Sequence, residues 1–213
     1  MGFSTLIDII GSVVIGGFLL LTLLRMNETA TSNNYNYSGE RIVQKNLVEV
    51  VQLIEYDFRK IGYSNNSDES KFPDQAKSII QADSTSITFL TDIVASQGTY
   101  GDGIIDTVRY YLGPLIASTP NPNDKILYRV VNHEQASGSN LGVTQFKITY
   151  FDDYDTKLGT FSNPMPSQPP FRIKTLEIDV AVENPAAYGK DYSFEKKAIW
   201  RQIRLAARNF RLR

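Results

Sequence analysis

Apolar side chains form an almost continuous run at the start of the chain, from Phe3 to Leu24, where the run meets Arg25. Its 22 residues, rising about 1.5 Å each, would make a helix of roughly 33 Å, which is long enough to cross the hydrocarbon core of a bilayer. Asp8 is the only charged residue inside the run. Insertion of a carboxylate into a membrane costs about 2.5–3.5 kcal/mol of free energy. Such a group therefore indicates a function and requires a partner that compensates its charge. We therefore expect residues 1–25 to form a membrane-spanning helix with a functional acid.

Two other interpretations of this segment stay open. A secretory signal peptide needs a basic start, a shorter apolar stretch and a small-residue cleavage site; no Lys or Arg precedes the run, and no Ala-x-Ala follows it. The second alternative is a plain single-span anchor in which Asp8 is incidental. N-myristoylation is excluded because Leu6 stands where that signal needs Ser or Thr. The small residues Gly11, Gly16 and Gly17 favour a helix that packs closely against other helices in lipid.

A polar stretch and then an amphipathic pattern follow the apolar run. Residues 26–40 are rich in Asn, Ser and Thr, whose side chains compete with the helix backbone, so they form either a flexible linker or a weak, solvated helix. Beyond them, apolar residues recur at steps of three and four and stop before Gly62. This spacing predicts an amphipathic helix that ends at Gly62 and packs on its own domain. The apolar positions are Val43, Leu47, Val50, Val51, Ile54, Phe58 and Ile61.

After a polar loop at residues 64–77, the pattern changes from the helical period to the strand period. Five segments are rich in β-branched and aromatic residues, mostly alternate, and are separated by clusters of Gly, Pro, Asn and Asp. They span residues 86–91, 106–112, 125–131, 143–151 and 172–182. One helix followed by a run of strands predicts an α+β domain over residues 41–213, in which an antiparallel sheet covers the helix.

The C-terminal segment, residues 196–213, fits two patterns. Counted as a helix it is basic and amphipathic; counted as a strand, its apolar residues share a face, and we favour a strand through about Ala207. The segment holds seven Lys or Arg and no acid, which leaves 15 basic and 23 acidic residues in the rest of the chain. It could contact an acidic neighbouring subunit, a membrane surface or DNA. The simpler interpretation is a solvated or internally paired edge.

Composition narrows the function classes. A formal net charge of −1 argues against a partner such as nucleic acid that is held by overall charge. Cys is absent, so the domain has no disulfide and no Cys-ligated metal, and His133 alone cannot build the usual zinc site. The sequence holds no Gly-x-Ser-x-Gly elbow, P-loop or dinucleotide fingerprint. We therefore expect a protein that is not an enzyme.

Calcium is the one cofactor that the residues suggest. The acids Asp152, Asp153 and Asp155 lie close together, and a second Asp-rich loop spans residues 101–106. Carboxylate oxygens are the ligands that Ca²⁺ prefers, although neither loop has the EF-hand spacing. Asp is also the ordinary residue of a hairpin turn, which is the competing interpretation of both loops.

The start of the chain resembles the N-terminus of type IV pilins and of the pseudopilins of type II secretion. The resemblance rests on Gly2 and Phe3, on an acid a few residues later, Asp8, and on the apolar helix around it. In that family the prepilin peptidase cuts after the Gly, and the Phe that follows is N-methylated. The resemblance implies processing between Gly2 and Phe3, and pairing of Asp8 with the new amino terminus of a neighbouring subunit.

The rest of the chain resembles the minor-pilin branch that includes the J-type pseudopilins. Residues 54–62, the Tyr-Tyr-Leu at 110–112 and the Leu-Tyr-Arg at 127–129 follow the order of that branch, and residues 205–209 echo its last strand. The likeness implies a pilin-like fold and a structural subunit of a pilus or pseudopilus, within a tip or priming complex. Its partners would be other pilin subunits, the prepilin peptidase and, before assembly, the inner membrane.

In the family's topology the protein would be a single-pass inner-membrane protein whose globular domain is periplasmic or extracellular. The alternative function is a membrane-tethered binding or adhesion module that is unrelated to filaments.

Overall fold

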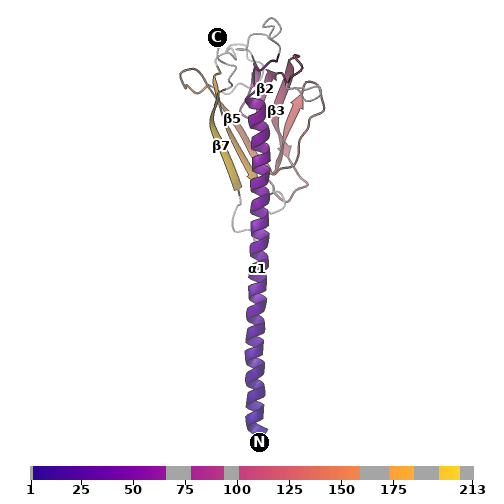
Figure 1. The fold of residues 1–213 in the computed structure, drawn as a ribbon, viewed down its shortest axis with the longest axis vertical. Coiled ribbons are helices and arrows are strands. Elements are labelled where there is room, and N and C mark those ends of the chain that lie inside the picture. Colours follow the sequence, from indigo (N-terminus) through magenta and orange to yellow (C-terminus); the bar gives the residue numbers. More distant parts are fainter. Residues whose placement is uncertain (1, 66–77, 94–100, 159–172, 185–196, 207–213) are drawn as a thin grey trace. The chain divides into compact units, whose positions relative to one another are not determined.

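The computed structural model describes residues 2–65, 78–93, 101–158, 173–184 and 197–206 (Figure 1). The chain divides into two compact units, Met1–Arg41 and Ile42–Arg213. One long helix, α1 (Gly2–Phe58), contributes to both units. The strands are β1 (Ile79–Ala82), β2 (Ser86–Thr91), β3 (Asp106–Leu115), β4 (Lys125–Val131), β5 (Val143–Phe151), β6 (Thr175–Glu183) and β7 (Lys197–Ala206).

The strands of the second unit form one antiparallel sheet in chain order, from β1 at one edge to β7 at the other. A long N-terminal helix and an antiparallel sheet confirm the predicted α+β class. All five strands expected from alternation are present, although β6 begins at Thr175 rather than at 172. The C-terminal segment is a strand through Ala206, and residues 207–213 lie outside the described part. Sequence reasoning missed β1, and it left residues 26–40 open, which the structure includes in α1.

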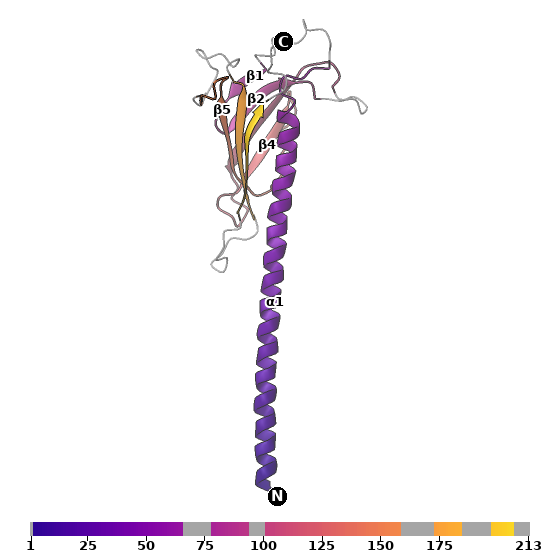
Figure 2. The same ribbon diagram turned by 60° about the vertical axis from the view of Figure 1, so that its left-hand side comes forward.

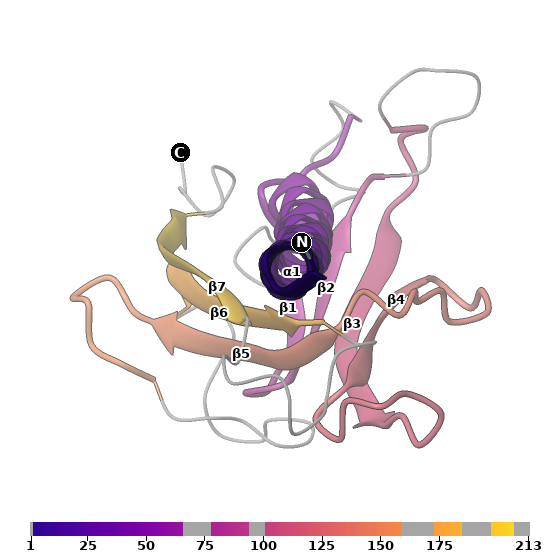
Figure 3. The same cartoon turned by 90° about the horizontal axis from the view of Figure 1, so that it is seen from below.

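The core of the second unit forms between one stripe of α1 and one face of the sheet, which curves around this part of the helix (Figures 2 and 3). The helix contributes the residues expected from their spacing, from Val43 to Phe58. Phe58 is fully buried, and its ring lies edge-on against the rings of Phe89 and Tyr110, with centroids 5.4 Å apart in each pair. Aromatic rings favour this edge-to-face arrangement. The last turn of the helix is therefore fixed to the centre of β2 and β3.

The α-helix ends at Phe58, four residues before Gly62, where its end was predicted. A turn carries the chain on to Gly62, whose φ of 75° is left-handed. Glycine adopts this conformation without the steric cost that a Cβ imposes, which is why it often terminates helices. The Gly62 amide then donates to the Leu90 carbonyl at 2.9 Å. The predicted helix end is thus tied directly to β2.

The sheet is joined least extensively between β4 and β5, which share a single paired position, Lys125 with Val143. The turn between β1 and β2 bridges this place, because the Ser84 carbonyl accepts a hydrogen bond from the Ile148 amide at 2.8 Å. The Tyr150 hydroxyl donates to the Asp83 carbonyl at 2.7 Å. The β1–β2 turn therefore connects the two halves of the sheet.

Candidate functional site

The apolar part of α1 exposes its large side chains on every side. From Phe3 to Leu24 these side chains are between 54% and 80% exposed. This is the one helix of the described residues that is long and apolar enough to cross a membrane, judged by length and composition. A contiguous apolar surface of this extent marks contact with a membrane or with other apolar surfaces. The first unit therefore offers the main candidate for a functional surface.

Three hydroxyl groups in this segment form hydrogen bonds within the helix itself. Ser12 Oγ donates to the Asp8 carbonyl at 2.7 Å, and Thr22 Oγ1 donates to the Phe18 carbonyl at 2.7 Å. Thr5 Oγ1 donates in the same way to the Gly2 carbonyl at 3.1 Å. Such bonds let Ser and Thr lie in an apolar environment without an unpaired donor.

The carboxylate of Asp8 differs from these hydroxyls. Within the described residues no donor or cation contacts it, and Asp8 carries the only charge between Phe3 and Leu24. An ionised carboxylate in an apolar environment requires a partner. Gly2 and Phe3 lie in the first described turn of the same helix, and the Phe3 ring is 80% exposed. The three residues expected to serve processing and assembly therefore lie on one short stretch of helix.

The backbone at the glycines of this helix is open to close approach. A Cβ built on Gly11, Gly16 or Gly17 would meet no atom within 4 Å. The small residues are therefore not required by packing within the chain. Their helical positions leave room for the backbone of another helix, as is usual between helices in lipid.

The acids considered for calcium organise a tight turn. The Asp152 carboxylate accepts hydrogen bonds from the amides of Tyr154 and Thr156, at 2.9 and 2.8 Å. Asp153 lies 3.8 Å from Lys174, and Asp155 has a left-handed φ of 63°. Across the described ranges, no group of three or more acidic or His side chains lies close enough together to hold a metal ion jointly. These are the contacts of a hairpin turn, the competing interpretation of this loop.

The second Asp-rich loop is also built around backbone donors. The buried carboxylate of Asp92 accepts from the amides of Asn65, Asp102 and Gly103, at 2.9 to 3.0 Å. Asp106 accepts from the Ile93 amide at 3.0 Å. These bonds fasten the chain before β3 to the residues that follow α1 and β2.

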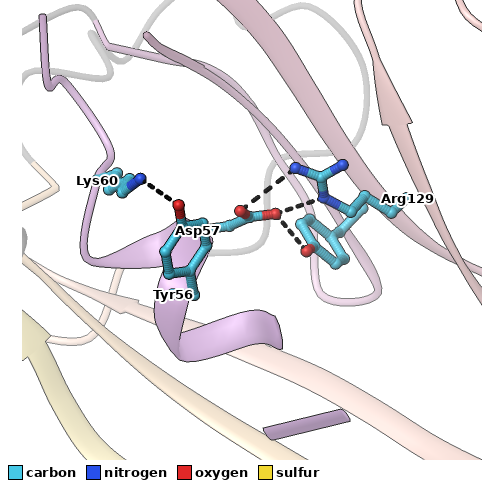
Figure 4. A network of polar contacts seen from close by, with 5 residues as sticks. Tyr56, Asp57, Lys60 and Arg129 are labelled. Atoms are coloured by element: carbon cyan, nitrogen blue, oxygen red, sulfur yellow. Dashed lines mark hydrogen bonds and ion pairs between the residues drawn. The ribbon is translucent and has the colours of Figure 1, made fainter. Parts of the chain in front are cut away.

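A buried ion pair at the end of α1 was not predicted from the sequence. Asp57 is fully buried, and its carboxylate accepts from Arg129 Nε at 2.6 Å, from Arg129 Nη2 at 3.3 Å and from the Tyr110 hydroxyl at 2.5 Å (Figure 4). One turn away, Lys60 Nζ donates to the Tyr56 hydroxyl at 2.7 Å. The signal available was an acid three residues after Ile54, on the apolar stripe of the helix.

The pKa shifts around this ion pair indicate a structural role. Burial raises the pKa of Tyr110 far above its ordinary value, and the charge of Asp57 adds to the shift. Burial acts to lower the pKa of Arg129, but the hydrogen bond and charge of Asp57 outweigh it and raise that pKa. Tyr110 therefore stays protonated and Arg129 stays charged. In these states both side chains can donate to Asp57 and so join α1 to β3 and β4.

No protein-family model matches the chain, and no curated protein matches it.

Proposed function

We propose that the chain is a minor pilin or pseudopilin, a structural subunit that joins a type IV pilus or a type II secretion pseudopilus through its N-terminal helix. The observation that carries the proposal is the exposed apolar surface from Phe3 to Leu24 with Asp8 as its only charge. The packing of the second half of α1 on an antiparallel sheet supports the same assignment. Before assembly the helix would cross the inner membrane once, with the sheet domain on the periplasmic or extracellular side.

Filament entry would exchange lipid for other apolar helices. Since lipid tails are as apolar as these side chains, the exchange exposes no apolar surface to water, and close packing at glycines favours it. The carboxylate of Asp8 would gain a cation at a fixed position along the helix axis, which lipid cannot supply. The pairing would therefore set the register between neighbouring helices.

The proposed pairing has a geometric consequence. If Asp8 binds the amino group of a neighbour that begins at Phe3 or its equivalent, the two helices are offset by the five residues that separate these positions. At about 1.5 Å per residue, this offset is roughly 7.5 Å along the helix axis. Neighbouring subunits would then rise in steps of that size.

The mature N-terminus tests the proposal. We expect mass spectrometry of the protein from its host to find a chain that begins at an N-methylated Phe3. A chain that keeps Met1, and that does not copurify with other pilin-like subunits, would contradict the proposal.

A second experiment separates a filament subunit from a tethered binding module. Residues 2–25 are replaced by an unrelated membrane span that has no acid. A filament subunit loses assembly, whereas a module that needs only a tether keeps its function.

A further inference from the structure

Asp124, the residue before β4, carries a fully buried carboxylate, neither oxygen of which has a hydrogen-bond partner among the described residues. Its backbone is held firmly, because its carbonyl accepts from the Ile116 amide at 2.9 Å and its amide donates to the Asn121 carbonyl at 3.3 Å. The β3–β4 loop thus positions the carboxyl group without giving it a donor.

Protonation of Asp124 does not resolve this arrangement. An ionised carboxylate that is buried without a partner is strongly unfavourable. A protonated carboxyl group has an O–H that also needs a partner, and neither oxygen of Asp124 has a hydrogen-bond partner in the described ranges. A bound cation, in contrast, compensates the charge and contacts the oxygens directly.

Further oxygen atoms surround this corner of the sheet. The pairing of β4 with β5, and of β5 with β6, brings the β3–β4 loop beside the start of β5 and the end of β6. The buried amide of Asn121 donates to Glu183 Oε2 at 3.1 Å. The Thr144 hydroxyl lies 3.4 Å from Glu183 Oε1. A second carboxylate, an amide and a hydroxyl therefore lie at the same corner as Asp124.

We propose that this corner binds a hard divalent cation, Ca²⁺, with Asp124 as its principal ligand and Glu183 as the second carboxylate. The chemistry favours this ion because the available ligands are oxygens of side chains, which Ca²⁺ binds in flexible geometry, whereas Mg²⁺ demands a near-ideal octahedron and keeps several waters. The ion would fasten the β3–β4 loop to the end of β6. This site is separate from the Asp152 turn, and the inference does not depend on the filament proposal.

A calcium titration of the full-length chain in detergent tests the site. After treatment with a chelator, the thermal midpoint is followed through the fluorescence of Trp200, the only tryptophan of the chain, which packs against the core. We expect CaCl₂ to raise the midpoint saturably, with half of the effect at about 0.1–1 mM, the range of extracellular calcium modules. Equal concentrations of MgCl₂ should raise it less, and an equal response to Mg²⁺ would overturn the choice of Ca²⁺.

Two variants locate the effect. Asp124→Asn should lose the calcium response, whereas Asp153→Asn, an equal loss of charge in the exposed hairpin turn, should keep it. Isothermal titration of the unmodified chain with CaCl₂ gives a reading that does not depend on how well the variants fold. Absence of binding heat and of a thermal shift in the unmodified chain would overturn the proposal, as would an unchanged response in Asp124→Asn.

Discussion

Replacement of the Arg129 guanidinium group by an uncharged side chain is the sharpest test of how the end of α1 is held to the sheet. In Arg129→Met, the fully buried carboxylate of Asp57 keeps only the Tyr110 hydroxyl as a donor. Breaking a buried ion pair from one side costs about 3–5 kcal/mol, because an uncompensated charge remains inside the protein. The side chain of Arg129 is 25% exposed, so water partly screens the pair and we expect a loss near the lower limit, about 3 kcal/mol.

The double variant Asp57→Asn/Arg129→Met separates the cost of the orphaned charge from the value of the pair. Because it removes both charges, we expect it to recover most of the loss and to lie within about 1–2 kcal/mol of the unmodified chain. Arg129→Lys keeps the charge but loses the planar group that reaches both carboxylate oxygens, so we expect an intermediate loss of about 1–2 kcal/mol.

Urea unfolding of the full-length chain in detergent, followed by Trp200 fluorescence, measures these differences. Arg59→Met is the matched control, since Arg59, the residue after α1, pairs with Glu55 at 3.7 Å and its side chain is 57% exposed. An exposed pair of this kind contributes less than about 1 kcal/mol. The reasoning is wrong if Arg129→Met costs no more than this control, or if the double variant is less stable than Arg129→Met.

Two further predictions concern the same unit. Burial raises the pKa of Tyr110 and of Tyr150 in the folded state. Above pH 10 only the unfolded chain therefore loses these protons, and the free energy of unfolding falls by about 1.4 kcal/mol per pH unit for each tyrosine. Urea unfolding at pH 9 to 11 should show a shallower fall for Tyr150→Phe, and an identical slope would contradict a raised pKa of Tyr150. Gly101 has a φ of 79°, and a Cβ there would lie 2.6 Å from the Asp92 carboxylate. Gly101→Ala should therefore cost about 1–3 kcal/mol in thermal or urea unfolding, and a neutral effect would show that the Asp92 loop is not held as described.

Local pattern was enough to predict the elements that are long or half-buried. β2 and the first half of β3 alternate because one face meets the core, and the stripe on α1 repeats at helical spacing for the same reason. β1 escaped detection because it has only four residues, one of which, Ile80, points an apolar side chain to solvent. A short edge strand gives too few alternations to recognise.

The buried polar cluster could not be predicted from the sequence because its members are far apart along the chain. Asp57 meets Tyr110 and Arg129, which lie 53 and 72 residues later. Such pairs form only once the sheet register is fixed, and no local pattern encodes that register. The acids at 152–155 illustrate the opposite case, because they are close together in sequence and the turn that they form is local: the backbone amides of Tyr154 and Thr156 donate to the carboxylate of Asp152.

The most direct test of the central claim is the incorporation of an Asp8→Ala chain into filaments, measured by quantitative mass spectrometry of filaments sheared from host cells. Ser12→Ala is the matched control, because the Ser12 hydroxyl donates a hydrogen bond within its own helix and needs no partner on a neighbouring subunit. Removing the acid should make the membrane form more stable by about 2.5–3.5 kcal/mol and should leave nothing to pair with a neighbouring amino terminus. The account predicts that Asp8→Ala accumulates in the membrane and is missing from filaments, while Ser12→Ala is incorporated normally. Equal incorporation of both variants would contradict it.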